Sequence, residues 1–204
     1  MKKLSKKSVL LFGAVLAVCA FAAPMASAAS WSPIGTTARL ASTNLGFSQA
    51  IGGGLTVGSS CALSTFDGDV ASAAVLTITG GRFDNCVGTG LAAGCTVTAT
   101  GTRFHWTATG VSTTDIQIHG IHVDVRFETA PGGGACNSLV HNTNITLTGT
   151  LTGGSFDPSS IGLNRKVTFV NASGLVSHSA LANGAPTLVT GTFFDPAGEL
   201  NLLM

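Results

Sequence analysis

The chain has 204 residues, of which 45% are hydrophobic and only 9% are charged, and its formal net charge is +1 at pH 7. This apolar content excludes an intrinsically disordered chain, and the weak charge argues against a nucleic-acid-binding protein. The length allows one large domain or two small ones.

The first predicted element is an export signal at residues 1–28. Four lysines lie within the first seven residues, an apolar run covers residues 9–23, and Ala26-Ser27-Ala28 forms a cleavage site of the A-x-A type. This order is typical of a helical secretory signal peptide. The run is short for a hydrocarbon core of ~30 Å, which needs about 20 residues. We therefore expect cleavage after Ala28 and a single secreted domain at residues 29–204.

The predicted mature chain keeps six basic and nine acidic side chains, a net charge of about −3. Thr, Ser, Asn and Gly, rather than ion pairs, are therefore expected to cover its surface. No later apolar run approaches the roughly 18 residues of a transmembrane helix. We expect no membrane span in the mature chain.

Alternation of apolar and β-branched polar residues with a period of two dominates the mature chain and predicts short β-strands. The clearest run is 145–152, in which Ile145, Leu147 and Leu151 would face a core and the threonines would face outward. Turn signals rich in glycine separate the runs. We expect an all-β fold, an antiparallel β-sandwich or a barrel-like sheet. The other expected strands lie near residues 61–66, 75–80, 96–102, 104–109, 114–119, 121–127, 166–170, 187–193 and 199–203.

A short pattern, T-G-[GT]-x-F, occurs four times along the chain. Its copies begin at Thr79, Thr100, Thr152 and Thr190. Because a glycine within a strand permits a bulge or a close approach of the backbone, we interpret each copy as a strand that bends at the glycine and then buries a phenylalanine.

Four cysteines remain after removal of the signal: Cys61, Cys86, Cys95 and Cys136. An even number in an exported chain predicts two disulfides, and no CxxC pair indicates zinc. Three connectivities are possible. We favour Cys61–Cys86 with Cys95–Cys136 because both loops then close locally, and Cys86–Cys95 with Cys61–Cys136 is the nested alternative.

A candidate polar face lies near the middle of the chain. His119 ends one alternating run, and His122 and Asp124 alternate in the next, with Gly120 between the two runs. The two runs form either a tight hairpin or one bulged strand. The face is interpreted as the solvated side of a sheet that carries cross-strand polar pairs, with a metal site or a sugar-binding surface as the alternative.

The two tryptophans, Trp31 and Trp106, are the candidate ligand-contacting residues. Trp31 lies three residues into the predicted mature chain, and Trp106 shares one face of a strand with Phe104. Both are interpreted first as core residues. The alternative is a platform for carbohydrate or lipid.

The sequence contains no recognisable catalytic or metal-binding motif. It lacks a G-x-S-x-G elbow, a calcium-loop frame and a G-x-G-x-x-G that opens a helix. We therefore predict no catalytic residues, no metal site and no cofactor.

Three segments resemble a known group of proteins: Cys61-Ala62-Leu63-Ser64-Thr65-Phe66-Asp67-Gly68, Phe83-Asp84-Asn85-Cys86 and Phe104-His105-Trp106-Thr107. Over these segments, and in pattern over residues 55–200, the chain resembles small secreted β-rich bacterial proteins of unknown role, of an actinobacterial type. More distantly, it resembles surface proteins of the alkane-oxidation activator type. The resemblance supports the pairing of Cys61 with Cys86 and implies an extracellular or envelope location. It supplies no catalytic residues.

These observations predict a non-enzymatic exported protein with a structural or adhesive role, secreted or at the cell surface and stabilised by two disulfides. Low charge removes the repulsion that keeps proteins apart, so we expect self-association or contact with the cell envelope or polysaccharide, and no nucleic-acid partner. The alternative is a binding module for polysaccharide or an apolar substrate. A hydrolase would require a serine or carboxylate beside a histidine in a pocket.

Overall fold

The computed structural model describes residues 30–112, 114–130, 135–156, 166–197 and 201–203, so the predicted signal peptide lies outside the described residues. The described residues form strands and contain no helix. The strands are β1 (Ser30–Ser32), β2 (Thr37–Ser42), β3 (Leu45–Gly52), β4 (Leu55–Ser72), β5 (Val75–Gly90), β6 (Cys95–Gly101), β7 (Trp106–Gly110), β8 (Asp115–Thr129), β9 (Thr143–Phe156), β10 (Lys166–His178), β11 (Pro186–Phe194) and β12 (Asn201–Leu203).

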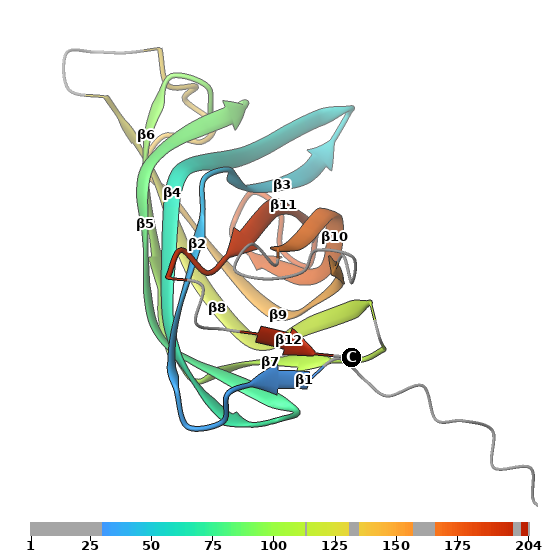
Figure 1. The fold of residues 1–204 in the computed structure, drawn as a ribbon. Helices are drawn as coiled ribbons and strands as arrows, with labels where there is room; N and C mark the ends of the chain where they lie inside the picture. The colour runs from blue at the N-terminus through green and yellow to red at the C-terminus, as the bar shows by residue number, and fades with distance from the viewer. Residues whose placement is uncertain (1–29, 113, 131–134, 157–165, 198–200, 204) are drawn as a thin grey trace, which may run out of the picture.

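Strands β2 to β11 form one antiparallel sheet that closes on itself (Figure 1). β4 pairs with β2 and β3 along one edge and with β5 along the other. From β3 the sheet continues through β11, β10, β9 and β8, and β8 pairs with β6 and β7, which both meet β5. The all-β prediction is therefore confirmed, and of its two forms the barrel-like sheet is the one observed.

The strands are longer than the sequence predicts. β4 has 18 residues and β5 has 16, and the predicted strands 114–119 and 121–127 are the two halves of β8. Glycines that resemble turn signals in the sequence lie within the strands, at bulges. Because a bulge bends a strand without ending it, the strands continue past these glycines. At one such bulge, between β4 and β5, the register shifts between Asp67 and Gly68.

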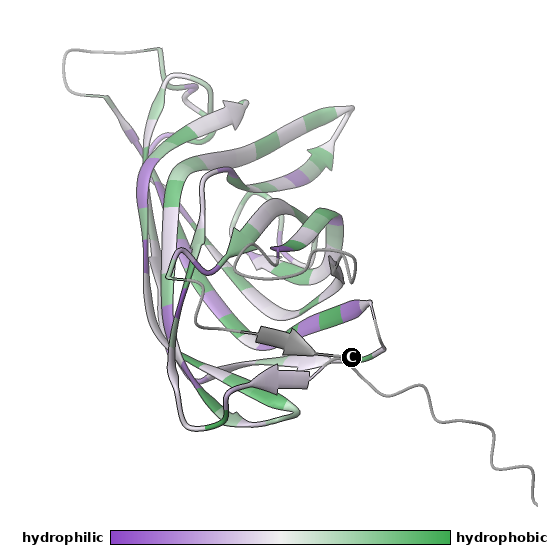
Figure 2. Ribbon diagram, viewed as in Figure 1, coloured by the Kyte–Doolittle hydropathy of each residue, from purple (hydrophilic) through white to green (hydrophobic). Residues whose placement is uncertain are grey.

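The core lies inside the closed sheet. Apolar and polar residues alternate along the strands, as the banding in Figure 2 shows. In β9, the residues Ile145, Leu147 and Leu151 are buried, as the sequence predicts. A chain of aromatic contacts runs through the interior, with ring centroids 4.9–5.9 Å apart; it comprises Phe47, Phe66, Phe83, Phe104, Trp106, Phe169 and Phe193.

The T-G-[GT]-x-F copies place a glycine against an apolar side chain. A Cβ atom added to Gly81 would lie 2.5 Å from the ring of Phe66, and one added to Gly154 would lie 2.5 Å from the ring of Phe169. The repeated glycines therefore make room for bulky side chains inside the sheet.

Both disulfides have the favoured connectivity, Cys61–Cys86 and Cys95–Cys136. Cys61 and Cys86 face each other directly in the β4–β5 pair. Cys95 begins β6, and Cys136 lies in the segment that precedes β9. The first disulfide therefore joins neighbouring strands, and the second attaches a connection to the sheet.

The two ends of the described chain meet outside the main sheet. β1 and β12 pair in an antiparallel manner, with Trp31 opposite Leu202. The Trp31 side chain is 3% exposed, and its backbone N–H donates a 2.7 Å hydrogen bond to the carbonyl oxygen of Ala73. The buried indole therefore anchors β1 to the main sheet.

In the part of the chain that the structure describes, no helix has the length and apolar character needed to cross a membrane.

Candidate functional site

The outer side of β6, β7, β8 and β9 carries an array of polar side chains, which we call the polar face. β8 contributes His119, His122 and Asp124, the three residues that the sequence places there. The neighbouring strands, together with the segment after β6, contribute threonines. The threonines that contact the β8 residues are Thr102, Thr109, Thr146 and Thr150.

A bulge at Gly120 brings the three β8 residues to the same side. The strand is continuous, so of the two sequence interpretations the bulged strand is the observed one. Gly120 has a φ of 72° and is exposed, and the β8–β9 register shifts between Ile118 and Ile121. One extra residue at this point keeps both isoleucines inside and both His119 and His122 outside.

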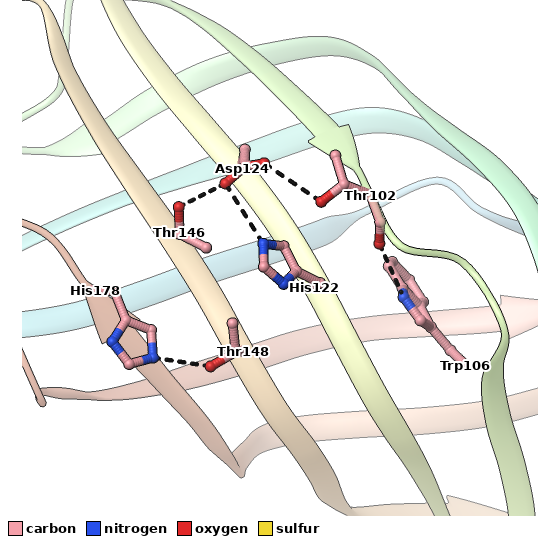
Figure 3. A network of polar contacts seen from close by, with 7 residues as sticks. All are labelled: Thr102, Trp106, His122, Asp124, Thr146, Thr148 and His178. Carbon is pink, nitrogen blue, oxygen red and sulfur yellow. Dashed lines mark hydrogen bonds and ion pairs between the residues drawn. The ribbon is translucent and has the colours of Figure 1, made fainter.

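Asp124 is the centre of the polar face (Figure 3). Its Oδ1 atom accepts a 2.5 Å hydrogen bond from Oγ1 of Thr146 on β9, and its Oδ2 atom accepts one of 3.4 Å from Oγ1 of Thr102. Nε2 of His122 lies 4.0 Å from Oδ1. The carboxylate thus links β8 to β9 and to the segment that follows β6.

Histidines make similar links between strands. Nε2 of His119 shares a 3.0 Å hydrogen bond with Oγ1 of Thr109, and Nδ1 shares one of 3.3 Å with Oγ1 of Thr150. On β10, Nε2 of His178 shares a 2.9 Å hydrogen bond with Oγ1 of Thr148, also drawn in Figure 3. Both nitrogens of His119 are therefore engaged between β7 and β9.

The chemistry that this face supports is hydrogen bonding and weak ion pairing. Nucleophilic catalysis needs a hydroxyl, a base and an orienting group beside a cavity that excludes water. Thr148 and His178 supply the first two on an open surface, and no histidine lines the three interior cavities described below. No group of three His, Cys, Asp or Glu side chains that could hold a metal ion occurs in the described ranges.

Both candidate ligand-contacting tryptophans lie in the core. Trp31 and Trp106 are each 3% exposed. Nε1 of Trp31 donates a hydrogen bond to the carbonyl oxygen of Ala108, and Nε1 of Trp106 donates one to that of Thr102. Neither ring is therefore presented on the surface, and only a ligand that enters the interior would meet one.

Three small cavities between the described residues follow one another along β8. The first, near Ile116, has about 20 Å³ and is lined in part by Trp31. The central one has about 40 Å³ and is lined by apolar side chains that include Ile121 and Trp106. The third, near Phe127, has about 10 Å³ and includes Gln49 and Thr187 in its lining.

Sequence reasoning missed the central cavity and its aromatic lining. The signal in the sequence was the repeated T-G-[GT]-x-F pattern, which predicted a bend and a buried phenylalanine in each strand but not that aromatic rings from several strands would meet in one interior.

The model of the family described as alkane oxidation protein activator PraA/PraB-like matches residues 1–171. No curated protein and no solved structure matches the chain.

Proposed function

The chain belongs to the alkane oxidation protein activator PraA/PraB-like family, and on this premise we propose that it is a non-enzymatic exported protein with a structural or adhesive role outside the cytoplasm. Two disulfides are compatible with an oxidising compartment. The low proportion of charged residues, 9%, favours association between copies because it reduces their mutual repulsion.

One surface feature carries the proposal: an apolar patch on the outer side of β10 and β11. Val176 faces Pro186 directly in the strand register, and Leu188 follows on the same side of β11. Val176 is 37% exposed and Leu188 is 40% exposed. Contiguous exposed aliphatic residues are typical of interaction surfaces. We name these three residues the β10–β11 patch and propose that it contacts a second copy of the chain.

We place the contact between copies on a face of the sheet rather than on a strand edge, because closure of the sheet pairs most of the strand edges. An unpaired edge is the usual site at which one sheet pairs with another. In β2, for example, Arg39, Leu40 and Ala41 are all paired with β4.

The test is the oligomeric state of the oxidised protein over a dilution series, measured by sedimentation velocity. We expect a concentration-dependent increase in mass that the double substitution V176T/L188T reduces at least several-fold. Threonine is β-branched and is favoured in strands, so the variant should keep the fold.

The matched control is Val87→Thr. Val87 is 58% exposed on β5, away from the patch in the strand order, and this substitution should leave association unchanged. A protein that remains monomeric at every concentration would contradict the self-association, and equal effects of the two variants would remove the patch from it.

Of the alternative functions, the binding of an apolar substrate is the one that a specific observation favours, namely the central cavity. A polysaccharide would stack on exposed aromatic rings, whereas the large apolar side chains exposed among the described residues are aliphatic.

A further inference from the structure

Four neighbouring strands of the closed sheet are almost free of charged side chains. β3, β11 and β9 contain no Asp, Glu, Lys, Arg or His residue, and β10, which lies between β11 and β9, carries one basic side chain at each end, Lys166 and His178. The hairpin of residues 179–185 between β10 and β11 is uncharged as well. We call the outward side of these four strands the uncharged face; it includes the β10–β11 patch.

The charged side chains gather on the other strands. In β4, Asp67 and Asp69 lie in the half that pairs with β2, whereas the half that pairs with β3 has no charged residue. Ion pairs of 2.7–3.1 Å lie on β2 and β4, on β5 and on β8; they are Arg39–Asp67, Arg82–Asp84 and Arg126–Glu128. Charge is therefore distributed to one side of the closed sheet.

This distribution determines what kind of surface can cover the uncharged face. A charged group of a partner would lose its hydration there without gaining a counter-charge, which is unfavourable. The partner surface must therefore be uncharged as well. A second copy of the chain supplies such a surface, and contacts between identical faces of two copies are the commonest kind in homo-oligomers.

His178 borders the β10–β11 patch. Its side chain is exposed and lies on the same side of β10 as Val176, because positions two apart in a strand share a face. Its Nε2 atom lies 2.9 Å from Oγ1 of Thr148, and Thr148 is the residue of β9 that faces Val176 (Figure 3). The imidazole therefore leans along the strand toward the patch.

The nearest strands offer His178 no counter-ion. On β9 it faces Thr146, and beyond Thr146 the next strand, β8, places Asp124, with Arg126 and His122 on either side of it. Two strand spacings amount to roughly 10 Å, which is about the Debye length at 0.1 M salt. The Asp124 carboxylate also accepts the Thr146 hydrogen bond and lies 4.0 Å from Nε2 of His122. It therefore does little to balance a charge on His178.

Histidine is the side chain whose charge ordinarily changes between pH 5 and 8. A second copy can cover a neutral imidazole at little cost, whereas an imidazolium at the same place would lose water without gaining a counter-ion. Separate chains therefore bind more protons than associated chains, and association weakens as the pH falls through this range. On the basis of the self-association proposed above, we propose that two copies meet through their uncharged faces and that protonation of His178 separates them.

The overall charge of the chain gives the opposite expectation. The predicted mature chain has a net charge of about −3 with neutral histidines and about +2 when all five histidines are protonated. The magnitude of its charge, and with it the repulsion between copies, is therefore smaller at pH 5 than at pH 8. Weaker association at pH 5 would consequently report a local group and not the overall charge.

The experiment is sedimentation velocity of the oxidised protein over a dilution series at constant ionic strength. We expect the dissociation constant to rise at least about five-fold between pH 8 and pH 5, as for a single unfavourable charge interaction in water. His178→Gln is neutral at every pH, and its amide can replace the contact of Nε2 with Thr148. This variant should associate equally at both pH values.

Two further variants test the assignment to one residue. His178→Lys carries a fixed positive charge and should associate at pH 8 only as weakly as the unsubstituted chain does at pH 5. His105→Gln is the matched control, because His105 is exposed in the segment between β6 and β7, outside the uncharged face. It should retain the pH dependence of the unsubstituted chain.

The unsubstituted protein provides an independent measurement through the NMR signals of its imidazole rings. His178 should take up its proton at lower pH in concentrated samples, in which the chains are associated, than in dilute samples. The protonation of His105 should not depend on concentration. This comparison decides the role of His178 even if a variant does not fold.

The outcomes separate this inference from the proposed function. A protein that is monomeric at every concentration and pH would contradict the self-association and this inference together. Association of equal strength at pH 8 and pH 5 would overturn the role of His178 alone and leave the self-association in place. The same follows if His178→Gln keeps the full pH dependence, or if His178 takes up its proton at the same pH in dilute and concentrated samples.

Discussion

Nε1 of Trp31 donates a 3.0 Å hydrogen bond to the carbonyl oxygen of Ala108, a residue 77 positions further along the chain. Both residues are buried, so a single side chain attaches the short strand β1 to β7. The contact combines apolar burial with satisfaction of a carbonyl group that water does not reach.

Replacement of this side chain should therefore be costly. We expect Trp31→Ala to lower the free energy of unfolding by about 3–5 kcal/mol. Trp31→Phe retains a ring but loses the N–H that is donated to the Ala108 carbonyl oxygen, and should cost about 0.5–1.5 kcal/mol through the lost hydrogen bond. Urea denaturation measures both. Ile34→Ala, at a side chain that is 63% exposed, should change the value by less than about 0.5 kcal/mol.

Glycines of the T-G-[GT]-x-F pattern should differ in their tolerance of alanine. A Cβ atom at Gly154 would lie 2.5 Å from the Phe169 ring and 2.9 Å from the Ile116 carbonyl oxygen, whereas one at Gly80 would meet no atom within 4 Å. We expect Gly154→Ala to cost about 1–3 kcal/mol through overpacking, and Gly80→Ala to change stability by less than about 0.5 kcal/mol. Equal thermal midpoints for the two variants would show that ring packing is not the reason for these glycines.

The Asp124 hydrogen bonds should contribute modestly. Asp124 is 46% exposed, and solvent weakens interactions at such a position. A double-mutant cycle with Thr146→Val and Asp124→Asn should give a coupling free energy below about 1 kcal/mol. Thr98→Val, at an exposed threonine on β6, provides the reference for replacing a hydroxyl on this face. A coupling of several kcal/mol would indicate that the network does more than join strands.

The two disulfides should stabilise the protein by similar amounts, but the loss of each should affect a different region of the structure. Their loops span 25 and 41 residues, and the chain-entropy model assigns about 0.4 kcal/mol more to the longer one. We expect each double alanine variant to lose about 2–4 kcal/mol. Hydrogen exchange should show local loss of protection at Val140 and His141, whose amides bond to the Asn137 carbonyl oxygen, when Cys95 and Cys136 are replaced.

The sequence predicted which side chains of a strand face the core better than it predicted where each strand begins and ends. Leu147 and Val123 were recognisable because alternation is local to each strand. β2 and β3 were missed because small residues such as Ala38, Ser42 and Gly46 weaken the alternation there. Glycines within long strands were interpreted as turns, since a bulge and a turn use the same residue.

The candidate site was predictable only in part. His119, His122 and Asp124 could be placed near one another from spacing alone. Their threonine partners on β9 depend on the register between β8 and β9, which is set by pairing across long stretches of chain. The burial of Trp106 and the cavity beside it depend on nine strands at once, and no local pattern reports such an arrangement.

Gly120 has a consequence for how this sequence can change over evolutionary time. If a residue were deleted or inserted between Ile118 and Ile121, the side chains in one half of β8 would exchange faces of the sheet, and the valines of the second half would face solvent. Length variation among relatives should therefore be absent from 115–129 and tolerated at an exposed loop such as 52–54, where three successive glycines protrude from the sheet.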